Sequence, residues 1–332
     1  MSFEINELSL DDQENEFKFP FKFGISKELD KDSNNFFNAS IHCLANIKKL
    51  TIHLFKSSNE SKDKYIYFIS DLLKDVKEEN NINIKELIKN LKRYIINEKK
   101  YPYETNKDPR QLIDFLLEDL HKKNELPKEI LAIINKKCNS CGYISESNNF
   151  LNIVKFDIPE IIRYKKNIKQ NNIITINTIN IFDCFDYYLK SVNYNKSIYC
   201  DKCQNKEIDL SIKELPSILI IFVYYGLDKN CCYENSYEFA EEINFKKYEL
   251  ENNNRDYFLS SIIACKNLGT YFELFYTFSR DNESSKYILF NGMEIRNNLG
   301  LKNKLIKNKI NLKDKKQTWP FVLIYTDKNI KI

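Results

Sequence analysis

The sequence has few of the residues that common protein chemistries require. Its 332 residues include three histidines, six glycines and seven prolines, and the formal net charge is only +4. So little glycine and proline excludes collagen-like and linker-like chains, and so small a charge does not by itself indicate a nucleic-acid-binding surface. Imidazole is the commonest general base near neutral pH, so histidine-dependent chemistry here must use His42, His53 or His121.

Long apolar segments are also absent. The longest run, Ile218 to Tyr225, is far shorter than the roughly 20 residues that a membrane span needs. The first residues carry neither the basic nor the apolar region of a secretory signal peptide. We therefore expect an intracellular protein, cytoplasmic or nuclear, with no membrane partner. Its hydrophobic content of 42% is enough to form a sizeable core.

The hydrophobic pattern divides the chain into a helical part and a strand-rich part. Apolar residues recur at helical spacing over 34–56, 64–98 and 108–121, and a further turn is expected at 130–134. From residue 143 onward, short runs typical of strands occur at 151–158, 218–225, 258–265, 271–278 and 321–325. Helices followed by strands predict the α+β fold class.

Four of the nine cysteines are arranged in two pairs. Cys138-Asn-Ser-Cys141 and Cys200-Asp-Lys-Cys203 each have C-x2-C spacing and are each expected on a turn. In a reducing compartment such pairs indicate a metal site rather than a disulfide. Four thiolates suit one tetrahedral, structural zinc ion (Zn2+) with no open coordination position. One weaker alternative is a redox role, because neither pair lies at the strand-to-helix start of a βαβ unit. The other alternative is that the four cysteines are unrelated to one another.

The remaining five cysteines show no metal-binding pattern of this kind. Cys43 lies on the helix expected at 34–56, and Cys184 lies close to two phenylalanines, so both are expected to be small core residues. Cys265 falls in an apolar run. Cys231 and Cys232 are adjacent in a polar stretch where they could bind metal or oxidise, and no role is assigned to them.

Five blocks, taken in order, carry a resemblance to a known family. They are Asn34 to Leu44, Asp108 to His121, the two cysteine pairs, Glu214 to Ile221, and a closing set formed by Leu268 to Tyr271, Tyr287 to Asn291 and Pro320 to Tyr325. They resemble the nucleophile box, the second thumb helix, the zinc-bearing fingers, the strand after the fingers and the closing palm segments of ubiquitin-specific proteases. This resemblance implies a papain-like cysteine-protease fold with fingers, palm and thumb.

The resemblance also implies a domain organisation. It implies a single ubiquitin-specific-protease-like domain at 21–328, and the acidic, polar residues 1–20 are expected to form an arm before it. Within that domain the thumb would cover about 30–135, the zinc-bearing fingers about 136–215 and the palm about 216–328.

The positions that match the family's catalytic residues hold side chains that cannot do its chemistry. Asn35 stands at the nucleophile position and offers no thiolate. Thr270 stands at the position of the base, and its hydroxyl cannot exchange a proton near neutral pH as imidazole does. Asn291 is tolerated at the third position but has no histidine to orient. Asp30 replaces the oxyanion-hole asparagine with a negative charge that would oppose a developing oxyanion.

No other pair of residues restores the missing dyad. All three histidines lie at or before residue 121, whereas the resemblance places the base in the strand-rich part. His42 takes the place of a family glutamine on the thumb helix, and His121 closes the second helix, so structural roles are expected for both.

These losses predict a pseudo-deubiquitinase, that is, an inactive relative of the cysteine-type deubiquitinases that serves as a protein-binding scaffold or a subunit of a larger complex. They resemble the losses in the pseudo-protease of the spliceosomal tri-snRNP and in the pseudo-protease domain of the poly(A)-nuclease deadenylation scaffold. Two alternatives are a non-hydrolytic ubiquitin reader, which would bind ubiquitin without cutting it, and an active deubiquitinase that uses unorthodox residues.

A lysine-rich stretch near the end of the chain suggests one further partner. Lys302 to Lys316 contains seven lysines and a single acidic residue, Asp314. Such a run could contact RNA phosphates or an acidic protein. The simpler interpretation is a solvated insertion between the last strands.

Overall fold

The structure is a computed structural model that describes sixteen segments of the chain. They are 35–57, 66–67, 81–97, 99–102, 108–151, 153–168, 178–191, 200–204, 208–225, 236–246, 248, 255–267, 272–280, 287–291, 294–299 and 318–330. Several predicted features lie outside these residues, namely the arm 1–20, Asp30, Thr270, Cys231, Cys232 and the stretch 302–316. For Asn35 and Asn291 the structure describes the backbone and not the side chain.

Helices come first along the chain, as predicted. They are α3 (Asn35–Ala45), α4 (Lys48–Ser57), α6 (Asn81–Asn97) and α7 (Pro109–Lys122), followed by the short 3-10 helix η1 (Lys128–Ile130). Two more helices, α8 (Ile158–Ile168) and α9 (Ile181–Ser191), lie within the strand-rich part. None of the described helices is both long enough and apolar enough to cross a membrane.

The main sheet contains eight strands. They are β3 (Ile153–Asp157), β6 (Ile218–Tyr224), β8 (Glu242–Asn244), β9 (Asp256–Asn267), β10 (Phe272–Arg280), β11 (Tyr287–Asn291), β12 (Glu294–Leu299) and β13 (Thr318–Asp327). Their order is β12-β11-β10-β9-β13-β6-β3, with β8 paired to β9. Every pairing is antiparallel except that of β3 with β6. The α+β class is thereby confirmed.

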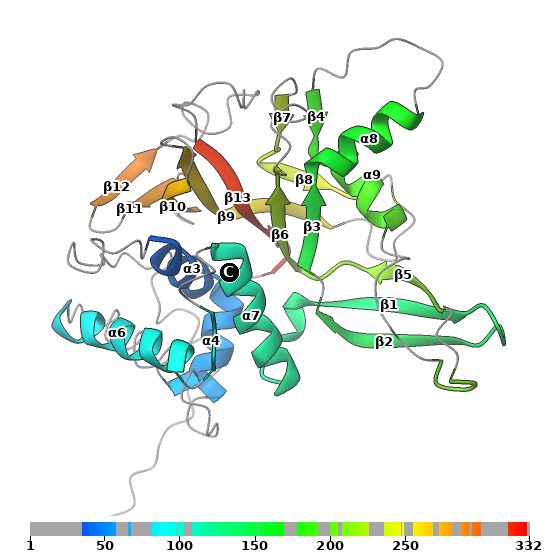
Figure 1. Ribbon diagram of the computed structural model, residues 1–332, viewed down its shortest axis with the longest axis horizontal. Helices are drawn as coiled ribbons and strands as arrows, with labels where there is room; N and C mark the ends of the chain where they lie inside the picture. The colour runs from blue at the N-terminus through cyan, green and yellow to red at the C-terminus, as the bar shows by residue number, and fades with distance from the viewer. Residues whose placement is uncertain are drawn as a thin grey trace, which may run out of the picture.

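A second sheet forms a finger-like projection, which Figure 1 shows extending from the rest of the molecule. It consists of β1 (Leu131–Cys138), β2 (Ile144–Leu151) and β5 (Ile208–Glu214) in the antiparallel order β2-β1-β5. Two short parallel strands, β4 (Thr178–Asn180) and β7 (Ser236–Glu238), form a third sheet.

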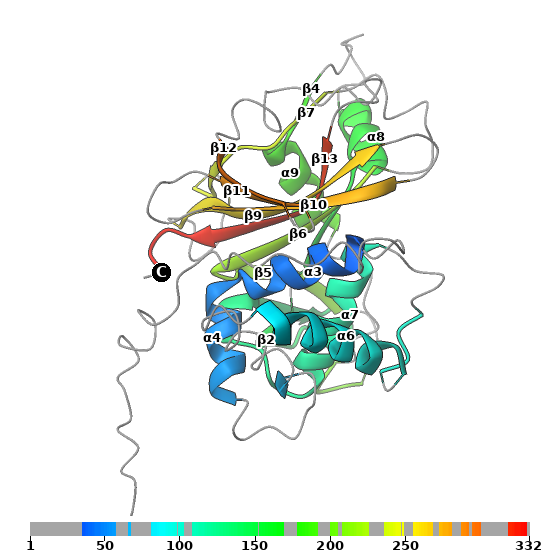
Figure 2. The same ribbon diagram turned by 90° about the vertical axis from the view of Figure 1, so that its left-hand side faces the viewer.

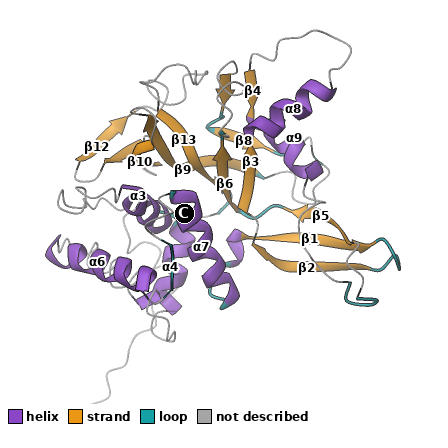
Figure 3. Ribbon diagram, viewed as in Figure 1, coloured by secondary structure: helices purple, strands orange, loops and turns teal. Residues whose placement is uncertain are grey.

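The helices cover both faces of the main sheet. In Figure 2, α3, α4, α6 and α7 lie on one side of the strands, and α8 and α9 lie on the other. The colouring of Figure 3 separates the same helical group from the projecting finger sheet. Strand β6 is buried along nearly its whole length, as expected for a central strand covered on both faces.

Local sequence explains why α7 begins where it does. The side chain of Asp108 accepts a hydrogen bond from the backbone N–H of Arg110 at 2.9 Å, which is the interaction of a helix N-cap. Pro109 occupies the first helical turn, where its missing N–H costs nothing. The apolar residues from Leu112 to Leu120 recur at helical spacing and are buried.

The structure corrects three sequence predictions about secondary structure. The helix predicted at 34–56 is two helices, because α3 ends at Ala45 and α4 starts at Lys48. At this break the side-chain amide of Asn46 donates to the carbonyl of His42 at 2.9 Å. The helical turn predicted at 130–134 is instead the start of strand β1, and the run 151–158 is divided between β2, β3 and the start of α8.

Candidate functional site

Helix α3, which begins at the predicted nucleophile position, is enclosed by its neighbours. Every residue from Phe36 to Ala45 is buried. The helix packs against β9, β10 and α7. Asn35 is its first residue. An element that supports a reacting side chain benefits from rigidity of this kind, and here it carries an amide.

Two of the other predicted catalytic positions come at or after the ends of main-sheet strands in the sequence. Thr270 belongs to the connection between β9 and β10, whose facing ends Asn267 and Phe272 pair with each other. Asn291 is the last residue of β11 and pairs with Glu294 of β12. The structure thus brings α3 against the hairpin that carries position 270, while the side chains at the four degenerate positions, Asp30 included, lie outside its description.

The cysteine nearest to the nucleophile position on α3 is not a reactive thiol. Cys43 is fully buried. Burial raises its pKa to about 12, although a side-chain hydrogen bond with Ser261 acts in the opposite direction. The thiol is therefore protonated at neutral pH and is a poor nucleophile. His42 is its neighbour in sequence, and adjacent helical residues point to different faces, so the two do not form a dyad.

The predicted core roles of Cys43 and Cys184 are confirmed. Cys184 and Cys265 are both buried, like Cys43. Burial also raises the pKa of Cys184 strongly. His42 is 3% exposed within α3, and His121 lies in the last turn of α7. No histidine lies in the strand-rich part of the sequence.

The two cysteine pairs meet at the tip of the finger sheet. Sγ of Cys138 lies 3.6 Å from Sγ of Cys203, and Sγ of Cys141 lies 3.6 Å from Sγ of Cys200. All four sulfur atoms lie within 4.8 Å of one another. Within the described part of the chain, this is the one group of three or more potential ligands able to hold a metal ion.

The chain forms both turns with backbone hydrogen bonds. In the first turn Gly142 N donates to Cys138 O, and Cys138 N donates to Tyr143 O, each at 2.9 Å. Gly142 has a φ of +69°, a value that glycine adopts without a steric penalty. In the second turn Gln204 N donates to Cys200 O at 2.9 Å. The two turns therefore have the same kind of local closure.

The geometry of this cluster fits a tetrahedral zinc ion. Zinc–thiolate bonds of about 2.3 Å in a tetrahedron imply sulfur–sulfur separations of about 3.8 Å, close to those in the cluster. Backbone N–H groups of Cys203 and Lys202 point at Sγ of Cys200 at 3.5 and 3.4 Å. The N–H of Cys203 is the main factor that lowers the pKa of Cys200 to about 7, which favours the thiolate that a metal requires. The predicted cluster is thus assembled, and it could hold zinc.

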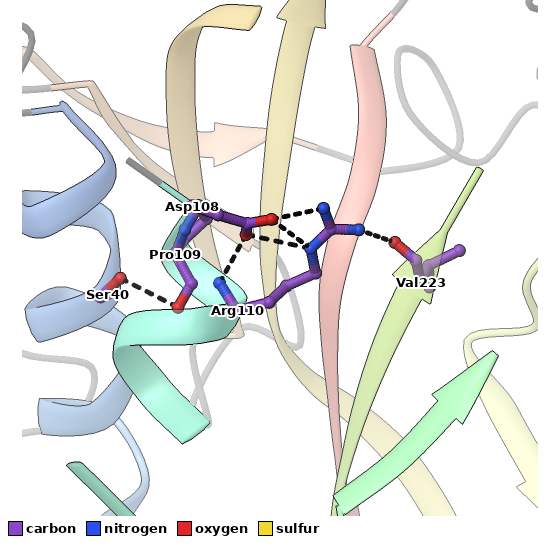
Figure 4. Close-up of polar contacts among 5 residues, drawn as sticks. All are labelled: Ser40, Asp108, Pro109, Arg110 and Val223. Atoms are coloured by element: carbon purple, nitrogen blue, oxygen red, sulfur yellow. Dashed lines mark hydrogen bonds and ion pairs between the residues drawn. The ribbon is translucent and has the colours of Figure 1, made fainter. Parts of the chain in front are cut away.

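A second polar arrangement joins helix α7 to the main sheet, as Figure 4 shows. The guanidinium group of Arg110 pairs with the carboxylate of Asp108, with Nε 3.0 Å from each oxygen and Nη2 2.5 Å from Oδ2. Its Nη1 donates to the carbonyl oxygen of Val223 in β6. The residue is 9% exposed. Sequence analysis marked the segment 108–121 but did not single out this arginine.

Two aromatic rings lie close to the same guanidinium group. Its central carbon lies 4.1 Å from the ring centroid of Tyr224 in β6 and 4.4 Å from that of Phe321 in β13. A planar cation near aromatic faces gains cation–π stabilisation, most strongly where water is excluded. We call the set Asp108, Arg110, Val223, Tyr224 and Phe321 the Arg110 clamp. A single arginine in the first turn of a helix gives no sequence signal for such a contact, because its partners on the sheet are more than a hundred residues away.

Helix α3 is tied to the same place. The hydroxyl of Ser40 donates to the carbonyl of Phe36 at 2.7 Å and lies 3.4 Å from the carbonyl oxygen of Pro109. Ser40 is fully buried. The start of α7 is therefore held between the helix that carries Asn35 and the strands that carry Val223 and Phe321 (Figure 4).

The sequence matches the family described as ubiquitin carboxyl-terminal hydrolase over residues 31–325. The match covers nearly the whole chain, and the protein belongs to this family. The resemblance to ubiquitin-specific proteases is thereby confirmed. A comparison with curated protein sequences gives no significant match.

Several solved structures share the fold. The SAGA DUB module of Ubp8, Sgf11, Sus1 and Sgf73 bound to monoubiquitin contains a chain with a TM-score of 0.57 and 14% identity, and the match covers 92% of this chain and 69% of that one. The same module bound to ubiquitin aldehyde has a TM-score of 0.57 and 15% identity, and the match covers 92% of this chain and 70% of that one. An essential yeast splicing factor has a TM-score of 0.57 and 13% identity, and the match covers 92% of this chain and 69% of that one. At these identities the likeness establishes the papain-like fold.

Proposed function

We propose that this protein is a catalytically inactive member of the ubiquitin carboxyl-terminal hydrolase family, and that it acts as a protein-binding scaffold or as a subunit of a larger complex. The observation that carries the proposal is the residue at the start of α3: the helix is the family's nucleophile helix by sequence, and its first residue is Asn35. A carboxamide cannot form the acyl intermediate of a cysteine hydrolase.

The described part of the chain supplies no replacement for this nucleophile. Cys43, on the same helix, is buried and protonated. Position 270, where the family has its base, holds a threonine, and no histidine follows His121 in the sequence. Asp30 and Asn291 occupy the two remaining catalytic positions, and neither can contribute to catalysis without a nucleophile and a base.

Zinc has a structural role in this proposal. Cys138, Cys141, Cys200 and Cys203 would hold the ion with all four coordination positions filled by thiolates, which leaves none for a substrate or water. The ion would join the β1–β2 turn to the segment that precedes β5. Cross-linking of this kind stabilises a projecting sheet that has little core of its own.

Complex membership is supported by the structural relatives. Ubp8 is present with Sgf11, Sus1 and Sgf73 in the SAGA DUB module, and that module binds monoubiquitin. The same fold also occurs in an essential yeast splicing factor. A scaffold role would use the outer surfaces of a fold that has lost its chemistry, while a non-hydrolytic ubiquitin reader is the second candidate. RNA binding by Lys302 to Lys316 stays a prediction from the sequence.

Two measurements test the proposal. Purified protein should not release the fluorophore from a ubiquitin-amide reporter, with an active family member as positive control, and partners should co-purify with the tagged protein from its own cells. Turnover that disappears in Asn35→Ala would overturn the inactive assignment. Affinity for ubiquitin in the micromolar range or better, without other stable partners, would favour the reader over the scaffold.

A further inference from the structure

The Arg110 clamp lies between the thumb helices and the palm sheet. Arg110 and Asp108 belong to the start of α7, whereas Val223 and Tyr224 end strand β6 and Phe321 lies near the start of β13. The guanidinium group of Arg110 reaches from the helix to strand β6 (Figure 4). The clamp thus fills the boundary between two parts of the fold with a buried cation.

This boundary is at the end of the sheet where β9 ends and β13 begins. The start of β13 pairs with the end of β9, through Thr318 with Lys266 and Trp319 with Cys265. The connection that carries position 270 follows directly after β9. On the helical side, Ser40 of α3 contacts Pro109, and Asn35 lies at the start of the same helix. The start of α7 therefore lies between α3, which begins at Asn35, and β13, whose partner β9 precedes position 270 in the sequence.

The chemistry of the clamp is specific for a guanidinium group. Arginine presents a flat fork of donors, and here the fork meets a carboxylate on one side and a carbonyl on the other. Its central carbon also lies over the rings of Tyr224 and Phe321. A lysine ammonium has no flat face and cannot bridge these two acceptors in the same way. The clamp is satisfied from within the chain.

In an active member of the family, the carboxyl terminus of ubiquitin would have to reach the start of the nucleophile helix. A ubiquitin carboxyl-terminal hydrolase must bring the carboxyl terminus of ubiquitin to its nucleophile, and the matching position here is Asn35. We propose that the Arg110 clamp holds the thumb closed on the palm and excludes the carboxyl-terminal tail of ubiquitin, so that this chain recognises proteins only through its outer surfaces. The inference rests on the proposed non-hydrolytic function and deepens it.

The test compares the full chain with its Arg110→Ala variant. Binding is measured by titration with intact ubiquitin and with ubiquitin that lacks its carboxyl-terminal tail. Arg163→Ala is the matched control, because Arg163 lies on the surface of α8 and pairs only with the nearby Glu160 among the partners described. Ethylguanidinium is the chemical probe, since it can refill the space that Arg110→Ala leaves between the two rings.

The natural chain should bind both forms of ubiquitin equally, whether weakly or not at all. Arg110→Ala should bind intact ubiquitin at least about tenfold more tightly, a difference that titration resolves easily. The tail-less form should show no gain, ethylguanidinium should abolish the gain, and Arg163→Ala should match the natural chain. Thermal unfolding establishes that each variant is folded.

Two results would overturn the proposal. One is a folded Arg110→Ala variant that gains no tail-dependent binding. The other is a natural chain that already loses about tenfold in affinity when the tail is removed. If Arg110→Ala does not fold, Arg110→Lys keeps the charge without the fork and is judged by the same two criteria. Reporter turnover by the natural chain, measured on the same samples, would instead count against the proposed function, so the two failures are distinguishable.

Discussion

Lys155 of β3 donates a hydrogen bond to the carboxylate of Asp114 in α7, with 2.9 Å between Nζ and Oδ2. Asp114 lies one helical turn after Arg110, so the two residues face the sheet from the same side of α7. Arg110 supplies the cation of the first contact, and Asp114, one turn later, supplies the anion of the second. Helix α7 is therefore joined to β6 and to β3 by contacts of opposite polarity.

The Lys155–Asp114 pair should make a small, salt-dependent contribution to stability. Burial alone would lower the pKa of Lys155, but the hydrogen bond and charge of Asp114 raise it overall. A lysine with a raised pKa contributes this stability below the ordinary lysine pKa and loses it only as the pH rises through the folded-state value. At neutral pH the contribution is therefore complete. Because Lys155 is 52% exposed, we expect Lys155→Met to lower the free energy of unfolding by only about 0.5–1 kcal/mol.

Urea unfolding at low and high salt checks this expectation. The difference between the natural chain and Lys155→Met should shrink at high salt, because salt screens exposed ion pairs. Lys122→Met is the control, since Lys122 forms an i,i+4 pair with Glu118 on the exposed surface of the same helix. A loss above about 2 kcal/mol for Lys155→Met would show that the pair does more than an exposed ion pair can.

The buried thiol of Cys43 predicts a loss of stability at alkaline pH. Its pKa rises from an ordinary value near 9 to about 12 because the thiol is buried. Above pH 9 the unfolded chain loses this proton while the folded chain keeps it, so folding becomes less favourable by about 1.4 kcal/mol per pH unit. Below pH 9 both states keep the proton and the effect disappears. Cys43→Ala should remove this part of the pH dependence.

Denaturant unfolding between pH 8 and pH 10.5 measures the slope. Cys43→Ala should be less stable than the natural chain at pH 8, since it leaves a small cavity, but its stability should decline more gently with pH. Ser140→Ala, in the exposed turn of the finger sheet, should keep the natural slope. Equal slopes for all three proteins would show that Cys43 does not carry a raised pKa.

Much of the fold could be predicted because local signals agreed with long-range packing. The C-x2-C spacing of the cysteine pairs predicted two metal-binding turns, and Gly142 with its positive φ lies in the first of them. The apolar spacing at 108–121 predicted a helix, which is α7. The apolar run at 218–225 predicted a strand, which is β6, and the structure buries nearly all of it.

Other features depend on tertiary contacts that no local pattern encodes. Helix α9 is short, and its aromatic residues suit a strand as well as a helix. It is stabilised by partners elsewhere: the ring of Phe185 packs edge-on against Phe156 at 5.0 Å and against Phe245 at 4.7 Å. The break after Ala45 also interrupts a pattern that remains apolar on both sides. The Arg110 clamp depends on strands β6 and β13, far along the chain.

Metal removal should affect the finger sheet before the rest of the molecule. Cys138 ends β1 and pairs with Ile208, the first residue of β5, so the cluster closes both strands. We expect about one zinc per chain, and we expect chelation or Cys138→Ser with Cys200→Ser to release it and expose β1, β2 and β5 to hydrogen exchange. Cys184→Ala, a buried cysteine outside the cluster, should keep its metal.

Elemental analysis and hydrogen–deuterium exchange together check this prediction. Chelated protein should exchange rapidly in the finger sheet while β9 and β13 stay protected, since those strands lie in the main core. A purified chain without stoichiometric metal and with a protected finger sheet would contradict the structural role of zinc.

Restoring the nucleophile alone should not restore catalysis. Asn35→Cys would place a thiol at the start of α3, yet position 270 would still hold Thr270 and could not take its proton. We therefore expect reporter turnover by Asn35→Cys to remain at background. The turnover of Asn35→Cys with Thr270→His should exceed that of either single variant, because a thiolate–imidazole pair acts as a unit.

The Asp30 charge would still oppose the oxyanion, and loss of one oxyanion donor is known to reduce kcat by about 100-fold to 1000-fold. Adding Asp30→Asn to the double variant should raise its turnover further, and Cys43→Ala in the same background should leave it unchanged. Initial rates on the ubiquitin-amide reporter measure each step. Turnover by Asn35→Cys alone would show that another group in the chain serves as the base, and would reopen the assignment of this fold as inactive.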